Sequence, residues 1–374
     1  MGPLRGIRVV EMVGLGPAPY ATRLLSDLGA DVVRVDRLVA KPPSAADPVN
    51  RDRPCVRADL KQPAGTEAVL RLIDSADAVV EPFRPGVMER LGLSPAVCLH
   101  RNRRLVYLRM TGWGQTGPLA SSAGHDINYI AVSGILHELR RSGDRPLPPL
   151  NLLGDYAGGS LFLVIGLLAG VLDARASGAG QVVDVSILDG VASLLTGQAA
   201  WQRIGAWDAT PGSNLLQTAA PFYDVYVTSD DRYLAVGAIE PKFYREFVSG
   251  LGLETEDLPR QYDRQSWPAV KQRFADVIRK HTRTHWEAVF AGTDACVSPV
   301  LSPEEAANYP HVKEREVFVE RDGAHWPAPA PRFSRTVAGA GHEVDGIDYT
   351  HQALSLAGFT DTEIDELIAT ATIG

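Results

Sequence analysis

Short apolar runs alternate with helical stretches over roughly the first half of the chain, and this alternation restricts the fold more than any other feature. Gly6–Met12 predicts a buried strand, a helix follows over 20–28, and Ala30–Asp36 predicts a second strand. Because such a crossover is right-handed, these two strands should be parallel neighbours. The continuing alternation implies a doubly wound α/β domain. Its other predicted elements are strands over 76–81, 105–110 and 181–187, a helix over 64–74 and helix within 87–100.

A second, smaller α/β block is predicted over roughly 222–320, after a helix and a connector over about 191–220. Two apolar runs flank Asp230-Asp231 and predict a hairpin with strands over 222–227 and 233–236. Helices are expected over 241–251, 267–279 and 284–290. Capping-box spacing marks three helix starts, at Thr284/Glu287, Ser302/Glu305 and Thr360/Glu363.

Two side chains capable of acid–base chemistry, His125 and Asp155, each lie at the N-terminal start of a predicted helix. After Asp155, the apolar run Leu161–Leu172 predicts a helix buried on nearly all sides. Prolines between the two helices separate them, so that their starts can converge where free N–H groups favour an anion. The first helix, which Asp126 is expected to cap, is predicted from apolar residues at three- and four-residue steps, namely Ile127, Ile130, Ala131, Ile135 and Leu139.

Each candidate residue also has a plainer interpretation. A histidine beside a capping aspartate can be a polar loop residue, and an aspartate before a glycine-rich helix can be only its cap. Glu240, between a predicted strand and helix, is either a helix-start carboxylate or a partner that stabilises a protonated histidine. Arg37 and Arg84 follow predicted strands, where arginines either bind phosphate or are simply solvated.

Several familiar sites are disfavoured by the sequence. Gly14-Leu-Gly16 after the first strand resembles half of a dinucleotide fingerprint, but Pro19 replaces its third glycine. A phosphate-bearing ligand that is not a dinucleotide is the alternative. His281 and His285 are four residues apart but lack the glutamate of helical zinc sites, and no G-x-S-x-G elbow occurs.

The overall composition sets further limits. The 374 residues are 45% hydrophobic, which supplies ample core material for two or three domains. A net charge of −8 without runs of like charge argues against nucleic acid or an anionic membrane as the main partner. Three scattered cysteines and no leader pattern lead us to expect a cytoplasmic protein. The twelve-residue run Leu161–Leu172 is shorter than the ~20 residues that span a bilayer.

Taken together, the motifs resemble the family III CoA-transferase superfamily, and within it the bacterial alpha-methylacyl-CoA racemases. The likeness covers essentially the whole chain, down to Gly237-Ala-Ile-Glu-Pro241 and Ala330-Pro-Arg-Phe-Ser334. The motifs that carry it are Gly29-Ala-Asp-Val-Val-Arg-Val-Asp-Arg37, Met110-Thr-Gly-Trp-Gly-Gln-Thr-Gly-Pro118, Gly124-His-Asp-Ile-Asn-Tyr129, Asn151-Leu-Leu-Gly-Asp155 and Gly180-Gln-Val-Val-Asp184.

This resemblance implies a particular architecture. A Rossmann-like larger domain would be built from both chain ends, residues 1–190 and 325–374, and a linker over 191–221 would lead to a smaller central α/β domain over 222–324. The resemblance also implies an interlocked homodimer, with the active site between the larger domain of one subunit and the smaller domain of the other. It makes His125 and Asp155 the catalytic bases, with Asp126, Asn151 and Glu240 in support, and it assigns CoA binding to Arg37, Arg84 and the main chain near Ala58 and Leu60.

The implied activity is racemisation of 2-methylacyl-CoA thioesters, with acyl-CoA as partner and no metal or redox cofactor. Transferases of the superfamily use the aspartate equivalent to Asp155 as a nucleophile and carry a glycine-rich loop in the smaller domain, where this chain has Glu240. A transferase needs one carboxylate, whereas a racemase needs two bases, and His125 supplies the second. A family III CoA-transferase and a catalytically silent acyl-CoA-binding protein remain the alternatives.

Overall fold

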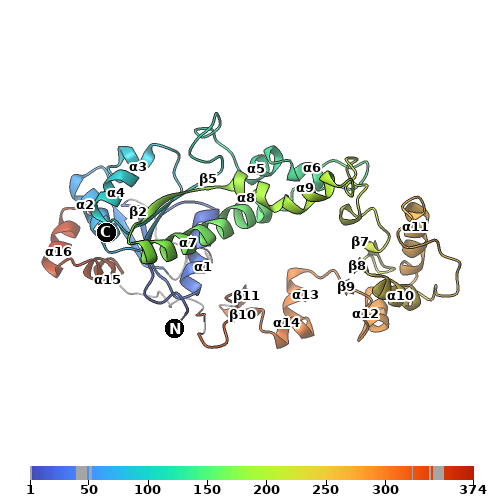
Figure 1. Cartoon of the computed structure of the whole chain (residues 1–374). Coiled ribbons are helices and arrows are strands. Elements are labelled where there is room, and N and C mark those ends of the chain that lie inside the picture. The colour runs from blue at the N-terminus through green and yellow to red at the C-terminus, as the bar shows by residue number, and fades with distance from the viewer. Residues whose placement is uncertain (1, 39–48, 50–52, 322, 337, 340–348) are drawn as a thin grey trace. The chain divides into compact units, whose positions relative to one another are not determined.

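The computed structural model describes residues 2–38, 49, 53–321, 323–336, 338–339 and 349–374 (Figure 1). It forms two compact units, of which the first comprises Met1–Ile135, Pro149–Thr196 and Ala328–Gly374, and the second comprises Leu136–Pro148 and Gly197–Pro327. Residues 136–148, which we expected in the larger domain, therefore group with the second unit. The reason is that Glu138 and Arg141 bind Gln217 and Asp224, respectively, within that unit.

A six-stranded, wholly parallel sheet forms the centre of the first unit, in the order β3-β2-β1-β4-β5-β6. The predicted parallel pairing of the first two strands is confirmed by the register Val9↔Val32. One strand was not predicted, because β3 is short and alternates polar with apolar residues. The strands are β1 (Arg8–Met12), β2 (Asp31–Arg37), β3 (Cys55–Ala58), β4 (Ala78–Glu81), β5 (Val106–Thr111) and β6 (Gln181–Ser186).

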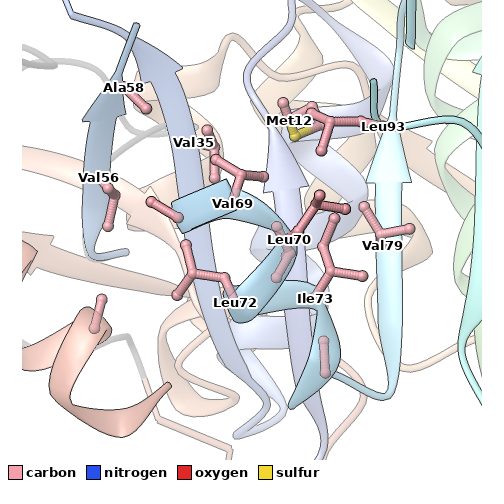
Figure 2. Packing of buried hydrophobic residues seen from close by; sticks show 14 of the residues in the cluster. Met12, Val35, Val56, Ala58, Val69, Leu70, Leu72, Ile73, Val79 and Leu93 are labelled. Atoms are coloured by element: carbon pink, nitrogen blue, oxygen red, sulfur yellow. The ribbon is translucent and has the colours of Figure 1, made fainter. Parts of the chain in front are cut away.

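Helices and the C-terminus cover this sheet. Prolines start several of the helices, where the missing N–H costs nothing. The side chains of α2 pack on the sheet: Figure 2 shows Val69 and Ile73 facing the strand residues Met12, Val35 and Val79. These helices are α1 (Pro17–Asp27), α2 (Pro63–Asp74), α3 (Val87–Arg90), α4 (Pro95–Arg101), α8 (Ile187–Leu194), α15 (Tyr349–Leu356) and α16 (Asp361–Ala369). The next helix after α8, α9 (Thr196–Arg203), belongs almost wholly to the second unit.

The strand order places a ligand crevice between β1 and β4. In open parallel sheets, ligands bind outside the carboxyl ends of the strands, where the order of connections reverses. The turns after β1 and β4 approach each other closely, since a Cβ at Gly14 would lie 2.3 Å from Cγ of Pro82. Any side chain that the fold delivers to this point is therefore a candidate for function.

The helix that carries Asp155 begins earlier than predicted and is less buried. A π-helix, η1 (Leu152–Ser160), runs directly into α7 (Leu161–Ser177), so Asp155 lies inside the helical segment and not before it. Burial on nearly all sides was also wrong, because Leu161, Ile165 and Leu172 are 46%, 59% and 69% exposed. Only the opposite face packs on β5, β6 and α1.

This helical segment is also longer than the twelve-residue apolar run in the sequence predicted. Together η1 and α7 span 26 residues, Leu152–Ser177, which is long and apolar enough to cross a membrane by length and composition alone. Of its most apolar 18-residue stretch, 44% is buried within the structure, and the core helices of soluble proteins can be equally long and apolar. The twelve-residue run therefore underestimated the length of the helix, because the π-helical turns of η1 precede it.

The predicted helix after His125 is interrupted. It consists of α5 (Asp126–Val132) and α6 (Ile135–Glu138), separated by Gly134. The φ angle of Gly134 is 90°, a left-handed conformation that ends a helix. The apolar spacing up to Leu139 therefore belongs to two short helices.

The second unit contains a three-stranded antiparallel sheet and its own core around Phe222, Phe247 and Phe274. The predicted hairpin is confirmed by the antiparallel pairing of β7 and β8. Capping at Ser302/Glu305 is confirmed, but Thr282 and not Thr284 caps α12, where it accepts the N–H of His285. The elements are β7 (Tyr223–Val227), β8 (Tyr233–Gly237), α10 (Pro241–Gly250), α11 (Trp267–Ile278), α12 (Arg283–Phe290), β9 (Val297–Pro299), α13 (Pro303–Asn308), α14 (Pro310–Glu314), β10 (Phe318–Arg321) and β11 (Ala324–Pro327).

A buried ion pair shapes the turn after β4. Glu81 is fully buried and accepts a hydrogen bond from Nε of Arg109 at 2.8 Å. Its other oxygen accepts the N–H of Phe83 at 2.9 Å, which fixes the turn that presents Arg84. Burial raises the pKa of Glu81 to about 7, although the bonds from Phe83 and Arg109 oppose the rise.

This raised pKa predicts a pH-dependent stability. The unfolded chain binds the proton of Glu81 more weakly, with a pKa near 4.5, so the free energy of unfolding should fall as pH rises from about 4.5 to about 7. We expect Glu81→Gln to reduce that fall by roughly 1–3 kcal/mol, measured by chemical denaturation between pH 4.5 and 8. The exposed control Glu304→Gln should keep the wild-type profile. An unchanged slope in Glu81→Gln would contradict the assignment.

Candidate active site

Asp155 lies at the crevice between β1 and β4. It is carried by η1, and a Cβ at Gly16, in the turn after β1, would lie 3.4 Å from Oδ2 of Asp155. Gly16 has a φ of 68° and is the residue before α1, so the glycine both permits this turn and leaves room beside the carboxyl. The glycine pair that resembles a dinucleotide fingerprint thus borders an aspartate.

Asn151 and Asp126 hold the Asp155 segment from two sides. Nδ2 of Asn151 lies 3.4 Å from Oδ2 of Asp155, and the backbone N–H of Asp155 donates to Oδ2 of Asp126 at 2.7 Å. Asp126 was expected to cap its own helix, but His125 occupies that cap position. The Asp126 carboxylate instead satisfies an N–H in the first turns of η1.

The Asp126 carboxylate is tightly enclosed. The residue is 7% exposed, and a Cβ at Gly154 would lie 2.4 Å from its Oδ2. Within the described part of the chain, Oδ1 of Asp126 is buried without a hydrogen-bond partner. A buried carboxylate so close to Asp155 affects the proton affinity of that residue.

The pKa of Asp155 is raised above its ordinary value. Burial is the main cause and the negative charge of Asp126 adds to it, while the bond from Asn151 and the charge of His125 act in the opposite direction. His125 is therefore within electrostatic reach of Asp155. A carboxyl with a raised pKa can donate a proton closer to neutral pH than an ordinary aspartate can.

His125 stands at the start of α5 with its side chain exposed. Its backbone N–H donates to Oδ1 of Asn128 at 3.0 Å, and its carbonyl accepts the N–H of Asn128 at 2.8 Å. These reciprocal bonds fix the backbone at the helix start, so the imidazole projects from a defined point. The first unit thus brings together four predicted residues, His125, Asp126, Asn151 and Asp155.

Tyr129 belongs to the same region but was not singled out from the sequence. It is 8% exposed and packs edge-to-face on Trp113, with ring centroids 4.8 Å apart. Burial raises its pKa and the charge of Asp155 adds to the rise, whereas the charge of Arg84 lowers it. Tyr129 therefore lies within electrostatic reach of both Asp155 and Arg84. The sequence signal that could have found Tyr129 is its position in the motif Gly124–Tyr129, four residues after His125.

The residues predicted to hold CoA share the carboxyl edge of the sheet. Arg37 ends β2 and is in register with Ala58, which ends β3. The main chain after Ala58 continues through Leu60, and Ile373, near the C-terminus, forms an isolated antiparallel bridge with Ala58. Arg84 lies in the turn after β4, and both arginines are exposed. Exposed guanidinium groups at this edge suit phosphate groups.

The family of the chain follows from comparison with known proteins. The model of CoA-transferase family III matches residues 4–345. The chain belongs to CoA-transferase family III. The resemblance drawn from the motifs is thereby confirmed.

Two curated relatives match this chain almost end to end. Alpha-methylacyl-CoA racemase of Mus musculus is 44% identical over 368 residues, which is 97% of this chain and 96% of that protein. Alpha-methylacyl-CoA racemase of Homo sapiens is 43% identical over 371 residues, with the same coverage of 97% and 96%. The crystal structure of a CAIB/BAIF family protein from Brucella suis has a TM-score of 0.81 at 22% identity, over 95% of this chain and 98% of that one. The last likeness supports the α/β fold.

Glu240 belongs to the second unit of this family III protein, so it is described apart from His125. It immediately precedes α10, as expected, and its side chain makes no capping hydrogen bond there. The carboxylate is exposed, and its charge helps to raise the pKa of Tyr262 after burial, the main cause.

The two histidines at zinc-site spacing do not form a metal cluster. Their rings stack with centroids 4.0 Å apart. Among the residues that the structure describes, no three His, Cys, Asp or Glu side chains gather at metal-binding distance. His281 and His285 therefore remain outside the candidate active site.

Proposed function

We propose that the protein is a racemase that interconverts the (2R) and (2S) epimers of 2-methylacyl-CoA thioesters. The observation that carries the proposal is that His125 lies within electrostatic reach of Asp155, an aspartate of raised pKa at the sheet crevice. It occurs in a chain that is 43–44% identical to two alpha-methylacyl-CoA racemases over nearly its full length. Inverting a carbon next to a thioester requires one group to remove its proton and another to return a proton to the opposite face.

In this mechanism His125 removes the α-proton from one epimer. The electron pair of the broken C–H bond moves into the thioester carbonyl and gives an enolate. Protonated Asp155 then donates a proton to the other face, and the roles exchange for the reverse reaction. These steps need no metal or redox cofactor. N–H groups at the start of α5 are our candidates for stabilising the enolate oxygen.

The supporting residues keep the two bases in opposite protonation states. Asp126 and Asn151 hold the segment of Asp155, as their contacts at 2.7 Å and 3.4 Å indicate. Glu240 would favour the protonated imidazole of His125. Arg37 and Arg84, with the main chain near Ala58 and Leu60, would hold the CoA phosphates and the pantetheine arm, far from the reacting carbon.

We further propose a homodimer that is interlocked, in which a second copy supplies Glu240 to the site. The exposed apolar residues Leu161, Ile165 and Leu172 recur along one side of α7, which is the spacing of a helix face that another surface covers. Analytical ultracentrifugation tests this assembly. A monomer at working concentrations would contradict it. We also propose that the enzyme acts in the cytoplasm.

Heavy water gives the direct test of the activity. A pure epimer of a 2-methylacyl-CoA should gain deuterium at the α-carbon and become a mixture of epimers, as followed by NMR. Absence of both changes would defeat the racemase proposal.

Two alternatives predict other outcomes in parallel assays. A CoA-transferase would move CoA to a free acid. Hydroxylamine would attack the covalent intermediate at the activated Asp155 carbonyl, displace the bound acid or CoA, and leave Asp155 as a hydroxamate. A catalytically silent binder would respond to His125→Ala only in affinity and folding.

A further inference from the structure

A cavity of about 380 Å³ lies wholly within the second unit. Its size falls in the range of about 300–1,000 Å³ that is typical of small-molecule sites. Aromatic rings make up much of its wall, and Trp201 stacks on Trp207 with centroids 5.8 Å apart. The lining also includes Ala206, Ile239, Tyr262 and Trp267.

The polar groups of the aromatic walls are already used within the protein. Arg264, which also lines the cavity, is exposed and donates from Nη2 to the carbonyl of Ser213 at 2.7 Å. Nε1 of Trp207 donates to Oε2 of Glu138 at 3.2 Å, and Nε1 of Trp267 donates to the carbonyl of Gln261 at 2.9 Å. The hydroxyl of Tyr262 donates to the carbonyl of Ile239 at 2.6 Å. A hydroxyl on a ligand would lose its water at these walls without gaining those partners, which is costly.

The cavity is also held in shape before any ligand arrives. The carboxylate of Glu138 accepts from Nε2 of Gln217 at 2.7 Å as well as from Trp207, and Gln217 in turn accepts from Asn214 at 2.8 Å. Asn214 and Gln217 are 3% and 7% exposed, so this network is buried. Because the apolar wall is already ordered, binding a hydrocarbon there does not cost the entropy of ordering its side chains.

The position of the cavity connects it to the proposed chemistry. Ile239, which lines the cavity, directly precedes Glu240. The hydroxyl of Tyr262 and Nε2 of Gln261 both donate to the Ile239 carbonyl, so the wall and the Glu240 backbone are fixed together. If the reacting α-carbon lies beside Glu240, the acyl chain that extends from it can therefore reach this apolar cavity.

We infer that this cavity binds the apolar far end of the acyl tail of the thioester. The inference rests on the proposed racemase function, because that function places the thioester near Glu240. The volume corresponds to roughly a dozen water-sized groups, which is room for a branched or ring-bearing tail. Short tails leave the cavity empty, and a hydroxyl placed against the aromatic walls has no partner there.

The experiment measures how α-proton exchange depends on the tail. For 2-methylacyl-CoA thioesters lengthened one methylene at a time, kcat/KM should rise about fourfold per methylene until the cavity is filled. A terminal hydroxyl should reverse the gain by about tenfold. Ala206→Trp, which fills the cavity, should flatten the length dependence. The control Ile204→Trp puts an indole on the same turn, at a side chain that is 74% exposed and does not line the cavity, and should keep the wild-type slope.

A titration of the same thioesters by tryptophan fluorescence gives an affinity series that does not require turnover. If exchange is absent with every thioester, the racemase proposal fails, and the affinity series still decides whether the cavity binds the tail. If exchange occurs but the wild type shows no length dependence, or Ala206→Trp keeps the wild-type slope, the cavity proposal is overturned and the racemase proposal stands. A side chain of a second copy filling the cavity would produce that second result.

Discussion

His125→Ala is expected to lower the rate of epimer interconversion by about 10²–10⁴-fold, the usual contribution of a positioned acid or base. Each base faces one side of the α-carbon in the proposed mechanism. The variant should therefore still exchange the α-proton of the epimer that Asp155 faces, and it should retain the configuration. Asp155→Asn should show the mirror behaviour, with exchange only of the epimer that His125 faces. NMR in heavy water, started from each pure epimer, separates exchange from inversion.

The control for this experiment is His281→Ala, a histidine of the second unit that has no place in the proposed mechanism. It should behave as the wild type in both assays. Equal loss of exchange from both epimers in His125→Ala would mean that one base serves both faces. Interconversion that survives in Asp155→Asn would remove Asp155 from the mechanism, since the asparagine cannot return a proton as the acid does.

The central sheet could be predicted from the sequence because most of its strands are encoded by short local stretches of residues. Val9 and Val10 lie in a short, largely apolar stretch between turns, as do the apolar residues of the buried strands that follow, and such stretches are typical of parallel sheets. β3 could not be found in the same way, because it has four residues and is defined by its pairing with Arg37 and with Ile373 at the opposite end of the chain. The exposure of one side of α7 was not predicted, because the hydrophobicity of a residue does not show whether another part of the chain covers it.

The candidate site was predictable by residue type but not by contact. The motifs indicate His125 and Asp155, yet the bond from the Asp155 N–H to Asp126 joins residues 29 positions apart and depends on how two helices converge. The proximity of Gly16 to Asp155 is likewise tertiary, and at the level of sequence Gly16 only resembles part of a nucleotide-binding turn. Whether Glu240 meets His125 depends on assembly, which no local pattern encodes.

Asp126→Ala is expected to weaken both the fold and the proton transfer, whereas Asp126→Asn should mainly shift the pH profile. The carboxylate has two separable effects on Asp155: its oxygen accepts the backbone N–H at 2.7 Å, and its negative charge contributes to the raised pKa. Asparagine keeps an acceptor oxygen but removes the charge. The pKa of Asp155 should then fall, so that the reaction direction in which Asp155 donates a proton loses rate at a lower pH than in the wild type.

The stability measurements complete this comparison. Asp126→Ala leaves the Asp155 N–H unpaired, and the free energy of unfolding should drop by about 1–3 kcal/mol in chemical denaturation. Asp126→Asn should lose less than half of that, because the bond can re-form to its amide oxygen. A wild-type pH profile in Asp126→Asn would show that the charge does not tune Asp155. Equal destabilisation of the two variants would show that the charge, and not the hydrogen bond, holds the first turns of η1 in place.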